Sequence, residues 1–154
     1  MPDTVTNFGG SETKDENGVS SYSFGNSNFF NCNNIKITEL PPQFTDGIGS
    51  YCFYNCPNVN ISVFGSKDYP ILGIAERALM NAGNNTITEL TIYCNSLEDI
   101  QAQAFRGYRV NISQLDIYMP SGATNDSTVI AQWGLTMTQD CTIKINDIVQ
   151  GGVS

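Results

Sequence analysis

The chain has 154 residues, enough for one domain with a hydrophobic core of its own. Its 15 acidic and 7 basic residues give a formal net charge of −8, which repels phosphate backbones and anionic lipids, so neither nucleic acid nor a membrane is expected as a direct ligand. The sequence has no histidine, which removes the commonest general base and excludes Ser-His-Asp and Cys-His catalytic arrangements.

Residues 1–21 show no hydrophobic periodicity and are predicted to form an extended or disordered N-terminal arm. Phe8 is the candidate anchor if this arm becomes ordered on a partner, and a terminus without a binding role is the alternative. The first residues lack the basic and apolar regions of a secretion signal, and no run of about 18 apolar residues follows. The sequence therefore predicts neither export by its own signal nor a membrane span.

Four segments then repeat one pattern, in which an apolar anchor lies four residues before a similar turn sequence. The anchors are Phe24, Ile48, Ile74 and Ile100, spaced 24, 26 and 26 residues apart. A period in the twenties is typical of solenoids that have one strand and one short helix or turn per coil. We therefore predict that residues 22–120 form an α/β solenoid of about five coils, each with one short parallel strand and a helical turn.

Each predicted turn is followed by a segment in which apolar and polar residues alternate, as in a half-buried strand. The predicted strands are residues 35–37, 59–63, 90–92, 115–117 and 142–145. Their apolar residues should point into the core, where Phe29, Phe53, Leu79 and Phe105 are expected to stack as an internal ladder. The outer face of the sheet would carry Lys36, Asn60, Ser62, Glu89, Thr91, Gln114, Asp116 and Tyr118.

Residues 121–154 depart from the repeat and are predicted to form a C-terminal capping segment, because the last coil of a solenoid must cover its own core. Trp133, the only tryptophan, is expected to pack in this cap. The alternative is an interface hot spot, since tryptophan is enriched at such positions.

The five cysteines are an odd number, so at least one thiol stays unpaired in a monomer. Cys32 and Cys56 share a repeat position that Ala82 fills in the next repeat, which predicts buried, reduced thiols stacked along the solenoid. A zinc site is disfavoured because only Cys52 and Cys56 lie close together, and a disulfide between them would need an oxidising compartment. No metal or other cofactor is therefore expected.

The string Ile48-Gly49-Ser50-Tyr51-Cys52-Phe53-Tyr54-Asn55-Cys56-Pro57-Asn58-Val59 closely resembles the unit of BspA-like leucine-rich repeat proteins. Residues 74–79 and 100–105 resemble the same unit, and residues 117–122 resemble a motif that often ends such arrays. The fourth repeat departs from the pattern, with Gly107 and Tyr108 in place of asparagine and a small residue. The resemblance implies a leucine-rich-repeat solenoid without catalytic residues. Similar repeats occur in bacterial and protist surface proteins that bind host or matrix molecules, and in bacteriophage virion proteins.

These observations predict a non-enzymatic structural or attachment module. The favoured setting is a tailed-phage virion, as a capsid or tail decoration or assembly protein, because the chain is short, acidic and rich in Asn and Thr. The alternative is a bacterial surface adhesin-type binding module, extracellular or at the cell surface. Expected partners are other protein subunits, virion proteins, a host surface receptor or further copies of this chain. The residues expected to contact a partner are Phe8, Asp116, Tyr118, Trp133, Thr142 and Lys144.

Overall fold

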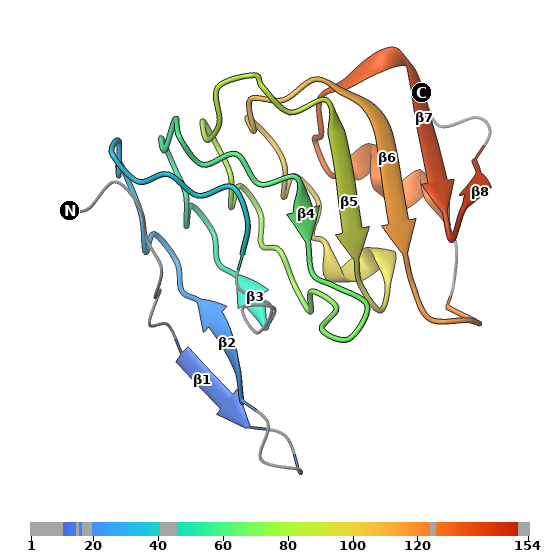
Figure 1. The fold of residues 1–154 in the computed structure, drawn as a ribbon, viewed down its shortest axis with the longest axis horizontal. Coiled ribbons are helices and arrows are strands. Elements are labelled where there is room, and N and C mark those ends of the chain that lie inside the picture. Colours follow the sequence, from blue (N-terminus) through green and yellow to red (C-terminus); the bar gives the residue numbers. More distant parts are fainter. Residues whose placement is uncertain (1–10, 15, 17–19, 41–45, 124–125, 151–154) are drawn as a thin grey trace.

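The computed structural model describes residues 11–14, 16, 20–40, 46–123 and 126–150, which form two sheets (Figure 1). A three-stranded sheet has the order β1-β2-β3, and a five-stranded sheet has the order β4-β5-β6-β7-β8. The strands are β1 (Ser11–Lys14), β2 (Ser20–Phe24), β3 (Gly47–Ile48), β4 (Val63–Phe64), β5 (Glu89–Tyr93), β6 (Ile112–Tyr118), β7 (Met137–Ile145) and β8 (Ile148–Val149). Two short 3-10 helices, η1 (Leu97–Asp99) and η2 (Ser127–Gln132), complete the elements.

Strands β4 to β7 are parallel, and each pairs with the strand one repeat away in the sequence. Leu115 of β6 lies between Leu90 of β5 and Ile143 of β7. Earlier repeats are joined by isolated parallel bridges, among them Ile48 with Ile74. Figure 1 accordingly shows similar loops in a row from blue to orange, with β4 to β7 side by side. The predicted strands 90–92, 115–117 and 142–145 are confirmed within β5, β6 and β7. Residues 35–37 are no regular strand, since Ile37 makes an isolated parallel bridge to Val59, and the strand predicted at 59–63 begins only at Val63.

The predicted helical turn of each repeat is wrong, because the described residues contain no α-helix and these segments are tight turns. In each repeat the backbone is left-handed at two positions four residues apart, with φ between 55° and 74°. The first position holds Ser27, Tyr51, Arg77 and Gln103, and the second holds Asn31, Asn55, Asn81 and Gly107. A right-handed helix cannot continue through left-handed residues, so these segments turn twice and the described fold is mostly sheet and turn.

The expected aromatic ladder lies in the core between the sheet and the turns. Phe53, Leu79 and Phe105 are fully buried, and half-buried Phe29 stacks on Phe53 with ring centroids 5.4 Å apart. Backbone bonds hold neighbouring rungs in register, as where the Phe53 N–H donates to the Ala78 carbonyl at 3.0 Å. Trp133 continues the ladder beyond Phe105, with ring centroids 6.0 Å apart. The core therefore extends from the repeats into the C-terminal segment.

The cysteine position of the repeat faces this core. Cys56 is buried, with its Sγ 2.8 Å from the Phe29 carbonyl oxygen, and all five thiols are free. Cys32 is only half-buried, so its predicted burial is wrong. In the fourth repeat Tyr108 takes this position, and its hydroxyl bonds the N–H and the carbonyl of Ile61, both at 2.7 Å. The Tyr108 hydroxyl thus satisfies the N–H and the carbonyl of Ile61, which would otherwise be buried without hydrogen-bond partners.

The predicted arm of residues 1–21 contains β1, and its end falls within β2. β1 pairs antiparallel with β2, while Ser23 and Phe24 of β2 pair in parallel with Gly47 and Ile48 of β3. The division into an arm, a repeat region and a capping segment stays a prediction, and Phe8 lies outside the described residues.

Candidate functional site

The outward face of β4 to β7, which we call the sheet face, brings together four of the six residues predicted to contact a partner. Asp116 of β6 lies opposite Lys144 of β7, and Gln114 lies opposite Thr142. Tyr118 follows Asp116 by two residues and therefore points to the same side of the sheet. None of these residues is buried. The period-2 alternation was sufficient to place them together, while their contact with a partner stays a prediction.

Charges and polar groups alternate across the sheet face. The Gln114 side-chain amide donates to Asp116 Oδ2 at 2.9 Å. Asp116 is flanked across the strands by Thr91 and by Lys144, so an acidic and a basic side chain stand on neighbouring strands. Val63 of β4 is 44% exposed at the edge of this surface. The sheet face thus offers charge, amides and a small apolar area, a mixture typical of protein-binding surfaces.

Trp133 is not part of this surface. Its side chain is 0% exposed and packs on Phe105 beside η2, so it has no surface to offer a partner in this fold. Its selection as a contact residue is therefore corrected. Its burial follows from its position directly after η2, where it covers the last aromatic of the ladder.

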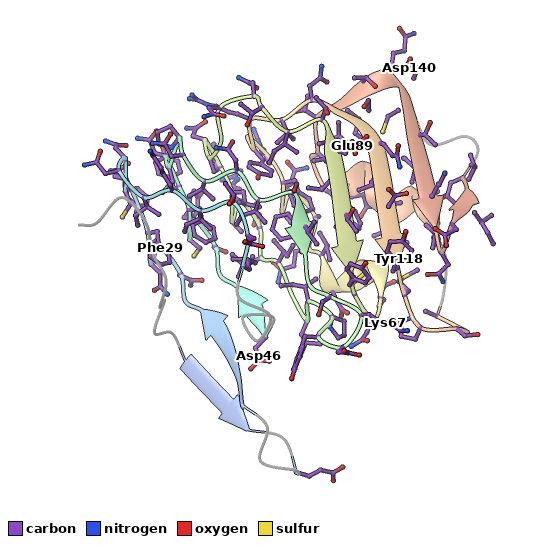
Figure 2. The ribbon with its side chains drawn as sticks, viewed as in Figure 1. Phe29, Asp46, Lys67, Glu89, Tyr118 and Asp140 are labelled. Atoms are coloured by element: carbon purple, nitrogen blue, oxygen red, sulfur yellow. The ribbon has the colours of Figure 1, made fainter. Side chains whose placement is uncertain are left out.

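A groove lies where the parallel strands end, next to the sheet face. Two tyrosines, Tyr93 and Tyr118, stack there with ring centroids 5.0 Å apart and planes 21° apart. We call this the tyrosine groove; its volume is about 530 Å³. It is lined by Ser66, Lys67, Pro70, Tyr93, Cys94, Asn95, Tyr118, Met119, Pro120 and Asn146. Figure 2 shows Lys67 and Tyr118 at the same end of the sheet, opposite the end that carries Glu89.

One wall of the groove is a turn held by its own hydrogen bonds. The Ser66 N–H donates to the Tyr69 carbonyl at 2.9 Å, and the Tyr69 N–H donates to Ser66 Oγ at 3.2 Å. Gly65 begins this turn with φ +78°, and a Cβ there would lie 2.7 Å from both the Ile71 nitrogen and the Tyr93 oxygen. Only glycine fits this position, so the wall is built by the backbone itself.

The opposite side of the groove is fixed by the turn between β7 and β8. Asn146 Oδ1 accepts from the Met119 N–H at 2.9 Å, and the Tyr118 hydroxyl donates to Asp147 Oδ1 at 3.1 Å. The hydrogen bond with Asp147, together with desolvation, raises the pKa of Tyr118. The side chains of Asn146 and Tyr118 are therefore held in position by hydrogen bonds within the protein itself.

Sequence reasoning missed most of the groove. Tyr118 was selected, but Tyr93, Lys67, Asn95 and Asn146 were not. A signal was present, because Ile92-Tyr93 and Ile117-Tyr118 end equivalent strands with the same residue pair. Lys67 and Asn95 reach the groove through turns, and no strand or helix period places turn residues.

A second aromatic cluster lies on the turns and serves below as a comparison. Phe30 is 46% exposed and stacks on Tyr54, with ring centroids 4.5 Å apart. Tyr51 meets Tyr54 edge to face, and the Tyr51 hydroxyl accepts from Arg77 Nη1 at 3.0 Å. None of these residues lines the tyrosine groove.

The described residues contain no group of three or more His, Cys, Asp or Glu side chains placed to hold a metal ion. Burial raises the pKa of Cys52 to about 12 and that of Cys56 to about 11, so both thiols are protonated at neutral pH. A protonated thiol is a poor nucleophile and a poor metal ligand. No helix in the described part of the chain has the length and apolar character needed to cross a bilayer.

Parallel strands one repeat apart, paired turns and a continuous apolar ladder define a repeat protein with an exposed sheet face. The chain belongs to the BspA-type leucine-rich repeat family: residues 16–125 match the repeat region of that family in six copies. No curated protein and no solved structure is significantly similar to the chain. Proteins of this family are generally non-enzymatic binding modules, typically surface-associated or extracellular, and their repeats typically mediate protein–protein interaction.

Proposed function

We propose that this chain is a non-enzymatic attachment module that binds a protein partner through the sheet face and the adjoining tyrosine groove. The observation that carries the proposal is the placement of Asp116, Tyr118, Thr142 and Lys144 on one exposed surface next to that groove. Strand pairing holds these side chains in a fixed array, which lowers the entropy lost on binding.

The proposal includes one continuous right-handed solenoid of about five coils across the repeats. It is supported by the parallel pairing of β4 to β7 and by bridges such as Ile74 with Ile100. In a solenoid each coil contacts only its neighbours, so the sheet face grows in proportion to the number of coils. A partner can therefore be met by several coils at once.

We propose a tailed-phage virion as the setting, with the chain as a capsid or tail decoration or assembly protein. Support comes from the acidic, asparagine-rich β composition and from the outer edge of the sheet. There β8 pairs with β7 only at Lys144 and Ile145, and Ile148 is 68% exposed. A neighbouring subunit, including another copy of this chain, would pair with such an edge.

The second candidate is a surface adhesin-type module that binds host or matrix proteins. It is favoured by the typical surface or extracellular location of BspA-type repeats. The same sheet face would carry the contact, so the two candidates differ in setting and partner.

Two measurements separate the candidates. Mass spectrometry of purified phage particles from the source organism should detect the chain at a fixed ratio to the capsid protein. Binding of the purified chain to immobilised matrix proteins, with the chain absent from particles, would favour the adhesin. Detection in neither would remove both settings.

The sheet face itself is tested by charge reversal. Lys144→Glu should weaken binding to the partner at least about tenfold, because it places two acidic residues opposite each other at the contact. Arg106→Glu is the matched control, since Arg106 is exposed on a turn and absent from the sheet face. Equal losses from both variants would contradict the proposed surface.

A further inference from the structure

We propose that the tyrosine groove is a binding site for a proline-rich peptide segment that carries a flanking basic residue. The inference rests on the proposed function, in which the partner is a protein, and names the part of that partner that the groove would take. It depends on the shape of the groove, its hydrogen-bonding groups and the charges around it.

The shape fits an extended segment. The groove crosses the ends of β4, β5 and β6, reaching Ser66 after the first, Tyr93 at the second and Pro120 after the third, and it continues to Asn146 after β7. Four neighbouring strands at about 4.8 Å spacing span about 14 Å. A polyproline II helix rises about 3.1 Å per residue, so four or five residues would fill that length.

The apolar lining fits proline rings. Tyr93 and Tyr118 are stacked on each other, so the aromatic surface they present consists of ring edges and outer faces. Pro70, Met119 and Pro120 extend this apolar surface on both sides. Grooves lined by aromatic residues bind polyproline II segments because these segments are already extended and lose little entropy on binding.

The groove offers several hydrogen-bond donors. Asn146 Oδ1 accepts from the Met119 N–H, and the Asn146 side chain also carries two amide hydrogens that can donate. Lys67 adds an ammonium group, and the exposed Asn95 adds a second side-chain amide. Proline has no N–H, so a proline-rich backbone presents chiefly carbonyl acceptors. The donors of the groove match the acceptors of such a segment.

A carbohydrate fits this lining less well. Sugars prefer a fully open aromatic face, whereas Tyr93 and Tyr118 cover one face of each other.

Acidic side chains stand at the margins of the groove. Asp147 bonds Tyr118, Asp116 lies two residues before Tyr118 on the same face, and Asp68 follows Lys67 in the turn. Together with the net charge of −8, these carboxylates favour a basic residue beside the prolines. This flanking residue would also set the direction in which the peptide lies.

The groove is tested with the full chain and a fluorescein-labelled octapeptide that combines prolines with one terminal arginine. Fluorescence anisotropy should show saturable binding with a dissociation constant below about 1 mM. Replacing the prolines by alanine should weaken binding at least about tenfold, which corresponds to ~1.4 kcal/mol. Replacing the arginine by glutamate should also weaken it, with a difference that shrinks as salt is added.

Variants locate the site. Tyr93→Ala should weaken peptide binding at least about tenfold, whereas Tyr54→Ala should not, because Tyr54 belongs to the other stacked aromatic pair and does not line the groove. Asn95→Ala, an exposed change that removes the amide donors without adding charge, should weaken binding severalfold and gives a second reading if Tyr93→Ala does not fold.

The outcomes are distinct. Absence of saturable peptide binding, or binding that both Tyr93→Ala and Asn95→Ala leave unchanged, would overturn the proposal. Saturable binding of an oligosaccharide in place of the peptide would replace the ligand class. If Lys144→Glu weakens binding of the whole partner while no proline-rich peptide binds, the proposed function stands and only the groove assignment falls.

Discussion

The repeat uses single residues to set the backbone at its turns. Asparagine accepts a left-handed conformation more readily than most side chains, and it occupies the second left-handed position at Asn31, Asn55 and Asn81. The Asn55 amide also donates to Asn31 Oδ1 at 3.0 Å, which links two neighbouring turns. The fourth repeat has Gly107 at this position, which meets the same backbone requirement without a side chain. Gly107 departs from the sequence pattern but allows the same left-handed backbone conformation as the asparagines.

We expect Gly107→Ala to destabilise the protein by about 1–2 kcal/mol, because Gly107 has φ +74° and a Cβ there would lie 3.1 Å from Met80 Cγ. The urea midpoint measures the effect. Asn81→Gly is the control and should change stability by less than about 0.5 kcal/mol, since glycine adopts the same conformation freely. An alanine variant as stable as the parent would rule out the left-handed turn at this position.

Buried thiols make stability fall in alkali. The pKa values of Cys52 and Cys56 are raised from 9.0 to about 12 and about 11 because burial disfavours the thiolate. The unfolded chain releases these protons above about pH 9 while the folded chain keeps them, so the stabilisation is full below that pH and is lost toward pH 11–12. Burial raises the pKa of Tyr108 as well, which adds a loss in the same direction.

The free energy of unfolding, measured in reductant between about pH 8 and pH 10.5, should therefore stay level up to about pH 9 and decrease above it. Cys56→Ala should show a shallower decrease, because it removes one of the buried thiols. The variant should still fold, since Ala82 fills the equivalent position in the next repeat. A flat profile in the parent chain would mean that these thiols titrate alike in the folded and unfolded states.

At the scale of elements, the aromatic ladder is the contact that joins one repeat to the next. Phe53 is fully buried between the first and third repeats and stacks on Phe29. The Tyr108 bridge to Ile61 and the burial of Trp133 on Phe105 continue this contact toward the C-terminal segment. Each repeat therefore depends on its neighbours for a closed core.

Phe53→Ala should cost about 3–5 kcal/mol through lost burial and the cavity that remains. Phe30→Ala offers a matched control, because Phe30 is 46% exposed and its loss should cost less than about 1 kcal/mol. Thermal or denaturant unfolding measures both. An unchanged midpoint for Phe53→Ala would show that the repeat register is wrong.

At the scale of the whole molecule, the two ends of the array differ. At the C-terminal end β7 extends the five-stranded sheet and β8 pairs with a small part of it. At the other end β2 lies between β1 and β3 and belongs to a separate sheet. The first repeats and the last therefore present different surfaces.

Deleting residues 1–21 should leave a folded chain, because Ser23 and Phe24 remain to pair with Gly47 and Ile48. The deletion should abolish incorporation into a particle or binding of the partner if the arm is a tether. Circular dichroism melting checks the fold, and particle incorporation or partner binding checks the arm. Normal incorporation of the deleted chain would remove the arm from the proposed contact.

The resemblance of residues 48–59 indicated the family, while the repeat spacing and the alternation of apolar residues were sufficient to predict the parallel strands β5, β6 and β7 and the residues of the aromatic ladder. These features follow from local patterns, since a strand has a side-chain period of two and every coil repeats the same burial. The same alternation placed Asp116, Tyr118, Thr142 and Lys144 on one face.

Only the tertiary structure decided the turns, the groove, and the choice between core packing and an interface for Trp133. The hydrophobic pattern does not indicate which residues, such as Arg77 or Gln103, have a left-handed backbone. The pattern alone therefore predicted helical turns in place of the observed tight turns. Trp133 is buried because Phe105, 28 residues earlier, lies beneath it. Lys67, Tyr93 and Asn146 meet in one groove because parallel pairing brings the ends of successive strands to the same edge, and no local pattern of residues specifies where those ends meet.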